Sequence, residues 1–309
     1  MEDNRRNFII KNELFLEKIS KRENSFKTNN IIERIICKQD EKNNIISFQG
    51  LPFSYSECAA KILFKNKILV NKESFEDVFK DVYEDMADFG VVPMENSTAG
   101  YINDIYDLLL KYDLFINYNY IMKIDHCLAG TLHSKLEDID EVYSHPQAIM
   151  QCKNYLDKNN LKAVNESNTA VAASKISNMN DKRKACICSP EAAAYYGLKI
   201  IESSINLKQN YTRFGAISKH LYANENHNRI SIVFKIPHEV GSLKDMMSIF
   251  SYYNVNLTSI YSRPDMESPW KYLFYLDFEG CILYRDIQII LNMLYNELPF
   301  IKILGSCKL

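Results

Sequence analysis

The sequence predicts an α/β protein that continues into a C-terminal ferredoxin-like unit. Short apolar stretches alternate with helical patterns from residue 45 onward, which is typical of sheets covered by helices. After a polar break at residues 221–228, the expected elements follow the order βαββαβ, which is that of a ferredoxin-like fold. A length of 309 residues and a hydrophobic share of 47% suit about two globular domains.

The expected elements of the first part follow one another along the chain. Short apolar strands are expected at residues 45–50, 89–93, 142–144, 163–164 and 185–188. Helices are expected at residues 55–64, from Thr98 or Asn103 to Leu110, and at residues 146–155, 169–176 and 190–196. This alternation favours parallel sheets, in which ligands bind at the carboxyl ends of the strands, beside helix N-termini.

The second part begins after residues 221–228, a polar stretch that we interpret as a linker. Its strands are expected at residues 229–236, 256–261, 270–278 and 301–304, and its helices at residues 241–253 and 284–294. The resulting domain prediction is an extension at residues 1–44, a first domain at 45–222 and a second domain at 228–309.

Residues 1–44 differ from the rest in composition, because they are rich in Asn, Lys and Glu and contain neither Gly nor Pro. Apolar residues such as Leu14, Leu16, Ile32 and Ile36 recur with loose helical spacing, which indicates one or two poorly anchored helices. A transit peptide is the alternative, but such peptides are poor in acidic residues and this segment is not.

The overall charge argues against a general nucleic-acid binder, since 37 basic side chains are set against 39 acidic ones. No apolar run of about 18 residues predicts a membrane helix, and the N-terminus lacks the pattern of a secretory signal. We therefore expect a cytoplasmic protein that contacts neither membrane nor nucleic acid. The eight cysteines form no CxxC pair and are expected to stay reduced, and the six histidines show no metal-ligand spacing.

Four polar clusters follow expected strands, and they lie at residues 95–100, 144–147, 165–169 and 210–214. In the first, small polar side chains and free backbone N–H groups suit an anion. In the last, Arg213 offers a planar fork for a carboxylate and Thr212 offers a hydroxyl. Each cluster alone is also explained as a helix cap or surface turn, but together they indicate a cleft for a small anionic ligand. The chain has no GxSxG, P-loop or GxGxxG motif, so no cofactor and no metal are expected.

Taken together and in order, these clusters resemble the prephenate dehydratase family with a C-terminal ACT regulatory domain. The segments that carry the resemblance read FQGLPFSYS at 48–56, VPMENSTAG at 92–100, YSHPQA at 143–148 and NYTRF at 210–214. In the second part, IYSRP at 260–264 falls where the ACT portion of this family carries ESRP, and ILGS at 303–306 resembles its closing strand. The likeness covers residues 45–309, which is most of the chain.

The resemblance implies a catalytic domain of two α/β lobes, like a periplasmic binding protein, with the active site in the cleft. One lobe would comprise about residues 45–120 and 205–222, and the other about residues 121–204. The implied activity is the conversion of prephenate to phenylpyruvate, water and carbon dioxide in L-phenylalanine biosynthesis, which is a decarboxylating carbon–oxygen lyase reaction.

The resemblance also implies roles for residues at matching positions. The implied catalytic residues are Asn96, Ser144, Gln151, Glu166 and Thr212, and the implied substrate-binding residues are Ser97, Thr98, Arg213 and Phe214. Prephenate is a dianion whose ring becomes aromatic on losing its ring carboxylate and 4-hydroxyl, so the enzyme must orient two carboxylates and supply a proton. Arg213, Asn96 and Ser97 suit the first task. Thr212 can hydrogen-bond the leaving oxygen, and Glu166 is a candidate proton source.

The sequence departs from the family pattern at a few positions. Phe53 stands where the family usually has glycine, Gly215 stands where an apolar residue follows TRF, and Tyr261 replaces the Glu of ESRP. Two other functions stay open at this point: arogenate dehydratase, whose motifs are nearly the same, and a non-catalytic amino-acid sensor. The intact TRF at 212–214 favours an active enzyme, because binding alone does not require a hydroxyl at the leaving group.

ACT domains of this family bind phenylalanine between subunits, so the resemblance implies L-phenylalanine as an effector and a homodimer or homotetramer. The implied effector-binding residues are Gly241, Ser242, Leu243, Asn256, Leu257, Ser262, Arg263 and Pro264. Because Tyr261 removes a carboxylate from this region, feedback inhibition is expected to be weaker than in relatives that have Glu.

Overall fold

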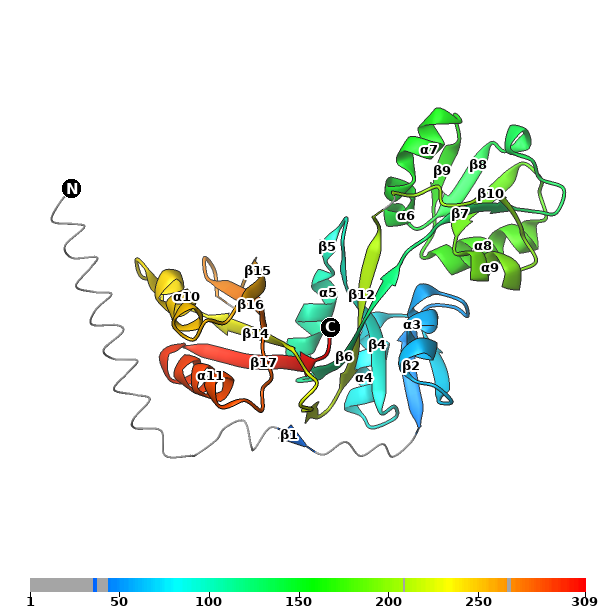
Figure 1. The fold of residues 1–309 in the computed structure, drawn as a ribbon. Coiled ribbons are helices and arrows are strands. Elements are labelled where there is room, and N and C mark those ends of the chain that lie inside the picture. The colour runs from blue at the N-terminus through cyan, green and yellow to red at the C-terminus, as the bar shows by residue number, and fades with distance from the viewer. Residues whose placement is uncertain (1–35, 38–43, 208, 266–267) are drawn as a thin grey trace, which may run out of the picture. The chain divides into compact units, whose positions relative to one another are not determined.

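The computed structural model describes residues 36–37, 44–207, 209–265 and 268–309, and its internal contacts divide the chain into two units (Figure 1). The larger unit is Asp40–Lys219, and the smaller one contains His220–Leu309 with the described residues Ile36 and Cys37. Most of the extension expected at residues 1–44 lies outside the described residues. Among the helices that are described, none combines the length and the hydropathy needed to cross a bilayer.

The first lobe of the larger unit is built on a sheet with the strand order β3-β2-β4-β12-β6, and β5 pairs with the end of β4. Its strands are β2 (Ile45–Gln49), β3 (Ile68–Lys72), β4 (Phe89–Asn96), β5 (Gly100–Tyr101), β6 (Phe115–Lys123) and β12 (Tyr211–Ser218). Its helices are α3 (Tyr55–Leu63), α4 (Phe75–Tyr83) and α5 (Asn103–Lys111). Fully buried side chains such as Phe79, Phe89 and Leu109 fill the space between helices and sheet.

The second lobe has a five-stranded sheet of its own, in the order β11-β7-β10-β8-β9. Its strands are β7 (Cys127–Gly130), β8 (Glu141–Ser144), β9 (Lys162–Asn165), β10 (Lys184–Cys188) and β11 (Lys199–Glu202). Its helices are the short η1 (Leu136–Asp138), α6 (Pro146–Gln151), α7 (Lys153–Lys158), α8 (Thr169–Met179) and α9 (Pro190–Tyr195). Neighbours such as Cys127 and Leu128 belong to different core clusters, so the sheet is buried on both faces.

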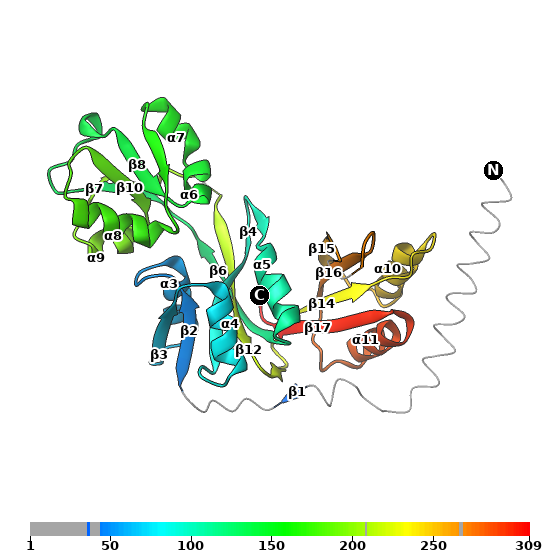
Figure 2. The same ribbon diagram turned by 180° about the vertical axis from the view of Figure 1, so that it is seen from behind.

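Two long strands join the lobes. The chain enters the second lobe along β6, which is followed by β7, and returns along β12, which follows β11 (Figures 1 and 2). β12 pairs antiparallel with both β6 and β4, whereas β2 pairs parallel with β3 and β4. The expectation of parallel sheets is therefore wrong for these strands, because a chain that goes out and back on neighbouring strands must reverse its direction.

Several further elements differ from the sequence expectation. The sequence patterns do not predict the strands β3, β6, β7 and β11 or the helix α4. The helix expected at residues 146–155 is divided into α6 and α7 at Cys152, whose φ of −100° and ψ of 7° end the first. Residues 210–214 do not lie between a strand and a helix but lead into β12. Ile36 lies in a short strand, β1 (Ile36–Cys37), where a helix was expected.

The smaller unit contains a sheet with the strand order β15-β16-β14-β17, and its elements follow the predicted βαββαβ order. These elements are β14 (Arg229–Lys235), α10 (Ser242–Tyr252), β15 (Leu257–Pro264), β16 (Tyr272–Glu279), α11 (Arg285–Glu297) and β17 (Phe300–Cys307). A further strand, β13 (Leu221–Tyr222), pairs with β1, so the first two residues of the expected linker form a strand. Phe234, Phe250 and Phe278 are fully buried in this unit.

Gly215 in β12 shows how β12 fits against the neighbouring β4. A Cβ atom placed on Gly215 would lie 2.8 Å from Cγ and 2.9 Å from Sδ of Met94. Met94 is fully buried, so its side chain cannot turn outward. The methionine therefore fills the space that a larger residue at position 215 would need, which explains the departure from the family pattern there.

Gly215→Ala is expected to lower the free energy of unfolding by about 1–3 kcal/mol, the usual cost of overpacking a core. Combining it with Met94→Val, which removes volume at the point of contact, should restore part of that loss. Urea unfolding of the full chain measures both variants, with Met94→Val alone as the reference. If Gly215→Ala costs the same with and without Met94→Val, the packing explanation is wrong.

Candidate active site

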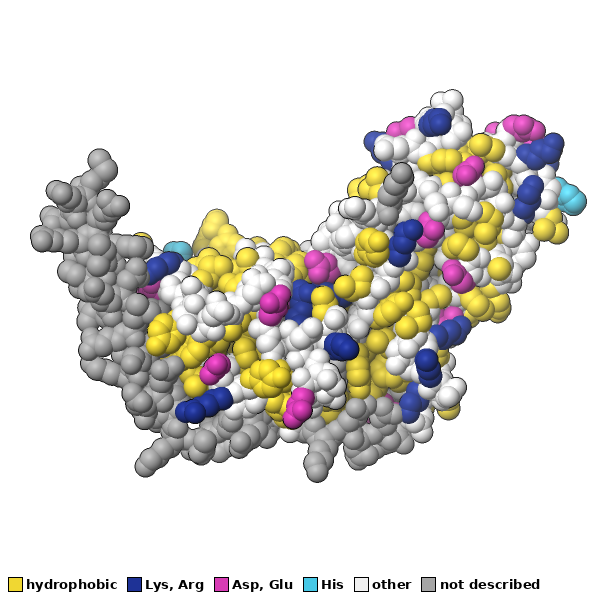
Figure 3. Space-filling model, in the orientation of Figure 1, with side chains coloured by type: hydrophobic (Ala, Val, Ile, Leu, Met, Phe, Trp, Pro, Cys, Tyr) yellow, Lys and Arg dark blue, Asp and Glu magenta, His cyan; other side chains and the backbone are white. Residues whose placement is uncertain are grey.

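A cavity of about 330 Å³ lies between the two lobes of the larger unit. The first lobe contributes residues of β2, α3 and β4, the second contributes residues of α6 and the start of α8, and β12 contributes two more. Among the described residues that line the cavity, none is Lys, Arg, Asp or Glu. Basic and acidic side chains are instead interspersed over the outer surface, as the face in Figure 3 shows. The cavity lining therefore contains both polar and apolar groups but no charged side chain near pH 7, apart from what its histidines contribute.

The side-chain amide of Asn96, at the end of β4, organises the cavity. Its Nδ2 donates to Thr212 Oγ1 at 2.9 Å and to Asn210 Oδ1 at 2.8 Å. Its Oδ1 accepts from the backbone N–H groups of Thr98, at 3.0 Å, and Ala99, at 3.2 Å. Because the oxygen and the nitrogen both have partners, the amide has one favoured orientation, in which Nδ2 faces the Thr212 hydroxyl.

The amide of Gln151, at the end of α6, connects the second lobe to Asn96. Its Nε2 donates to Thr98 Oγ1 at 2.9 Å and lies 3.3 Å from Asn96 Oδ1. Its Oε1 accepts from Asn210 Nδ2 at 2.8 Å. Gln151 and Asn210 are both buried, so water does not compete for these hydrogen bonds. One cluster of amides therefore spans the cleft from β4 to α6.

His126 and Tyr55 form a second polar group in the cavity lining. His126 lies between β6 and β7, and its Nδ1 is 3.2 Å from the hydroxyl of Tyr55, which donates to the Asp125 carbonyl at 2.9 Å. Burial lowers the pKa of His126 to about 4, and the hydrogen bond with Gln151 opposes this only in part. Burial is also the main cause that raises the pKa of Tyr55. Both groups are therefore uncharged near pH 7.

The helices α3 and α8 begin at the cavity. The side chains of Ser54 and Asn168 cap them by accepting a backbone N–H of the first turn. Within the described residues, the remaining N–H groups of these first turns have no hydrogen-bond partner, and they belong to Tyr55, Ser56, Thr169 and Ala170. Helix N-termini carry partial positive charge, so these groups give the cavity a positive potential without a cationic side chain.

Four of the implied site residues line the cavity, namely Asn96, Gln151, Thr212 and Phe214. Thr98 joins them through its hydroxyl, which donates to Asn96 Oδ1 at 2.6 Å. The hydroxyl of Ser97 instead donates to the Gln209 carbonyl at 3.1 Å, outside the lining. Since Asn96 Oδ1 occupies the N–H groups of residues 98 and 99, the backbone anion cradle expected at residues 95–100 is closed.

Arg213 does not line the cavity. Successive residues of a strand point to opposite faces of the sheet, so Arg213 faces away from the side of Thr212. Its guanidinium lies 3.2 Å from the Glu95 carboxylate and donates to the Tyr106 hydroxyl at 3.1 Å. The guanidinium fork that was expected to bind a substrate carboxylate is thus engaged by a carboxylate of the protein itself.

Glu166 and Ser144 are also absent from the cavity lining. The Glu166 carboxylate forms an ion pair with Lys175. The Ser144 hydroxyl is fully buried and donates to the Ile187 carbonyl at 2.7 Å, which joins β8 to β10. The structure therefore does not bring the expected proton source to the cavity, and Ser144 supports the second sheet.

His126 and Tyr55 were not among the site residues expected from the sequence. His126 stands alone in the sequence, and a single histidine without a second ligand or base at regular spacing carries no pattern. Tyr55 is part of the FQGLPFSYS segment, which was the one available signal. Their pairing depends on residues 71 positions apart and becomes visible only in the fold.

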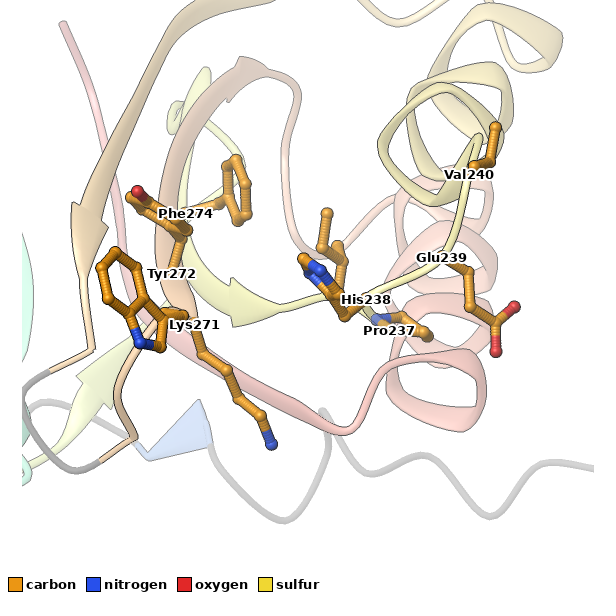
Figure 4. Close-up of a pocket in the computed structure, with 9 residues that line it drawn as sticks. Pro237, His238, Glu239, Val240, Lys271, Tyr272 and Phe274 are labelled. Atoms are coloured by element: carbon orange, nitrogen blue, oxygen red, sulfur yellow. The ribbon is translucent and has the colours of Figure 1, made fainter.

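The smaller unit has a separate cavity of about 360 Å³, which Figure 4 shows. It is lined by residues 236–240, between β14 and α10, by Trp270 and Lys271 just before β16, and by Tyr272 and Phe274 at its start. Gly241, with a φ of 94°, begins α10 directly after this loop. None of the implied effector-binding residues, as far as they are described, belongs to this lining.

The neutral state of His126 makes the stability of the chain depend on pH. The folded pKa of about 4 lies below the unfolded value of about 6.5, so between these values only the unfolded chain takes up the proton. The free energy of folding that the neutral His126 contributes is complete above pH 6.5 and is lost as the pH falls from there through 4. At pH 5 the loss is about 2 kcal/mol.

His126→Gln should therefore reduce, by about that amount, the difference in unfolding free energy between pH 7 and pH 5. Urea unfolding at both pH values measures it, with a variant at the exposed His133, His133→Gln, as the control. A pH dependence that is the same in His126→Gln and in the unaltered chain would show that His126 is not held neutral.

Comparison with known proteins agrees with this geometry. The family model described as prephenate dehydratase matches residues 46–221. The chain is 35% identical over 283 residues to "Arogenate dehydratase/prephenate dehydratase 1, chloroplastic" of Arabidopsis thaliana, with 86% of this chain and 72% of that protein covered. It is 31% identical to the "Bifunctional chorismate mutase/prephenate dehydratase" of Escherichia coli K12, with 89% of this chain and 73% of that protein covered.

Among solved structures, the prephenate dehydratase of Arthrobacter aurescens in complex with L-Phe matches with a TM-score of 0.78 and 25% identity. This match covers 86% of the present chain and 90% of the other. The match to the family model includes β4, α6 and β12, which hold Asn96, Gln151 and Thr212 around the cavity. The chain therefore belongs to the prephenate dehydratase family.

Proposed function

We propose that this chain is a prephenate dehydratase of L-phenylalanine biosynthesis, and that the reaction takes place in the cavity between the two lobes. The observation that carries this proposal is the Thr212 hydroxyl, which lies in the cavity and accepts a hydrogen bond of 2.9 Å from Asn96 Nδ2. With the amide occupying a lone pair of Oγ1, the hydroxyl hydrogen of Thr212 can be donated to another oxygen. That oxygen would be the 4-hydroxyl of prephenate.

The two carboxylates of the substrate need positive potential, and no basic side chain among the described lining residues supplies it. The first turns of α3 and α8 offer four backbone N–H groups in its place, at Tyr55, Ser56, Thr169 and Ala170. We assign carboxylate binding to these turns. Arg213, Ser144 and Glu166 then act by supporting the site, through the hydrogen bonds and ion pairs described above.

In the proposed reaction, the bond between the ring and its carboxylate breaks and carbon dioxide leaves. The electron pair of that bond moves through the ring diene and expels the hydroxyl from C4, which makes the ring aromatic. The departing oxygen takes up one proton to become water. Thr212 donates the hydrogen bond that stabilises the developing negative charge on this oxygen, and the proton comes finally from solvent.

Thr212→Val should lower kcat by about 100-fold, the usual scale for a positioned proton-donating group, and change KM little. Thr212→Ser keeps the hydroxyl and serves as the matched control, which should retain most of the activity. Steady-state turnover of prephenate, followed by the absorbance of phenylpyruvate, measures both. A Thr212→Val variant that keeps nearly normal kcat would remove Thr212 from the mechanism.

The cavity also favours prephenate over arogenate, in which an ammonium group replaces the side-chain ketone. No carboxylate among the described lining residues can pair with that ammonium group, and the two helix N-termini repel it. The value of kcat/KM for prephenate should therefore exceed that for arogenate by about tenfold or more. Turnover of the two substrates by the purified full chain tests this, and equal values would contradict it. Turnover of neither substrate would overturn the proposed function itself.

We further propose that the larger unit, expected at residues 45–222, is the catalytic domain, and that the smaller unit, expected at residues 228–309 but beginning at His220, is an ACT regulatory domain. This domain would bind L-phenylalanine between the subunits of a homodimer or homotetramer. The βαββαβ order of the smaller unit and the L-Phe in the related Arthrobacter aurescens structure support this proposal. The positions proposed for the effector lie at the start of α10, at Gly241, Ser242 and Leu243, and at or near β15, at Asn256, Leu257, Ser262, Arg263 and Pro264.

Tyr261→Glu should strengthen inhibition by phenylalanine, because it restores the carboxylate of ESRP, and an effector acts only through contacts that differ between two states of a protein. In the present chain the Tyr261 ring lies 6.5 Å from that of Tyr275, so Tyr261→Phe is the control that keeps this contact. Calorimetry gives phenylalanine binding and the activity assay gives inhibition. Equal inhibition of Tyr261→Glu and the unaltered chain would discard the role given to Tyr261.

A further inference from the structure

Phe53 has a backbone conformation that its side chain disfavours. Its φ is 64°, in the left-handed region that glycine adopts freely and bulky residues adopt at a cost in free energy. Phe53 directly precedes Ser54, the residue that caps α3. A strained residue at this place needs compensating interactions, and the structure shows what they are.

The Phe53 ring is held between the two lobes. On one side it stacks on the ring of Tyr195, at the end of α9 in the second lobe, with 4.2 Å between centroids and 27° between planes. The Lys61 ammonium of α3 lies 4.6 Å from the centre of the same ring. The backbone N–H of Phe53 donates to the Glu57 carboxylate at 2.6 Å, and Glu57 also pairs with Lys61 at 2.9 Å.

These contacts connect the cavity wall of the first lobe to the second lobe. Ser54, Tyr55 and Ser56 follow Phe53 immediately and line the cavity, and they include two of the N–H groups assigned to the substrate. The Phe53 ring also packs against the core cluster of the second lobe. The first turn of α3 is thus positioned by a ring whose main partner belongs to the other lobe.

We propose that Phe53 is a positioning residue, and that its stacking on Tyr195 holds the first turn of α3 against the second lobe before substrate binds. We call the stacking contact of Phe53 on Tyr195 the clasp. Its role in turnover rests on the proposed function, whereas the existence of the clasp between the lobes does not. In the absence of the ring, the fraction of molecules with a formed cavity falls, and the apparent affinity for substrate falls by the same factor.

Removal of either ring should therefore raise KM for prephenate by about three- to tenfold, the scale of one aromatic pair, and leave kcat within about twofold, since bound substrate closes the cavity. The variants are Phe53→Gly, for which a φ of 64° is favourable, and Tyr195→Ala, at a side chain that is 55% exposed. Neither is expected to unfold the chain. Phe53→Tyr and Tyr195→Phe keep the stacked rings and should retain the normal KM.

The double variant shows whether the effects of the two substitutions on KM depend on each other, as a clasp requires, or are independent. If the rings act on each other, Phe53→Gly combined with Tyr195→Ala should raise KM no further than either change alone. If the two rings had only a structural role, removing them would lower the melting temperature and leave both KM and kcat near their normal values. Multiplication of the two effects in the double variant, or a KM within twofold of normal in both single variants, would overturn the proposal.

A second measurement needs no substrate. Hydrogen exchange of the substrate-free chain should be faster in Phe53→Gly at the bonded N–H groups of the first turn of α3, those of Glu57 and Cys58, and at the end of α9. It should be normal in Phe53→Tyr. If the unaltered chain failed to convert prephenate, the proposed function would be wrong while this experiment still tested the clasp. Unchanged exchange at both segments in Phe53→Gly would show that no clasp exists.

Discussion

The site depends on the side-chain amide of Asn96. This one group accepts from the backbone that follows β4, donates to Thr212 on β12, and lies within hydrogen-bond distance of Gln151 on the second lobe. The cluster is buried, so each amide has a fixed orientation and each unmet hydrogen bond would be costly. The same hydrogen bonds that connect the two lobes thereby orient the Thr212 hydroxyl, which the proposed reaction requires.

A cavity without charged side chains among its described lining residues suits a reaction whose driving force is already present in the substrate. Backbone N–H groups at helix starts can orient a dianion and cost no reorganisation when carbon dioxide leaves. The uncharged His126 and Tyr55 contribute polar groups to the cavity and add no titrating group near pH 7. The enzyme then has to provide position and one hydrogen bond, and these are what the Asn96 cluster provides.

The sequence predicted the elements whose hydrophobic pattern is local, such as the helix α3 and the βαββαβ order of the smaller unit. It did not predict β6, because no polar cluster marks the strand that carries the chain between the lobes. The motif at 210–214 placed Thr212 and Arg213 together, yet strand alternation sends them to opposite faces. The role of His126 depends on Tyr55, far away in the sequence, and no local pattern records that contact.

In the proposed mechanism, Thr212 faces the leaving oxygen while helix N-termini hold the carboxylates. The most direct test is a crystal structure of the slow Thr212→Val variant with prephenate bound. We expect the 4-hydroxyl of the substrate to lie against residue 212 and its carboxylates to lie at the first turns of α3 and α8. A substrate carboxylate on the guanidinium of Arg213, or a substrate bound outside the cavity between the lobes, would contradict it.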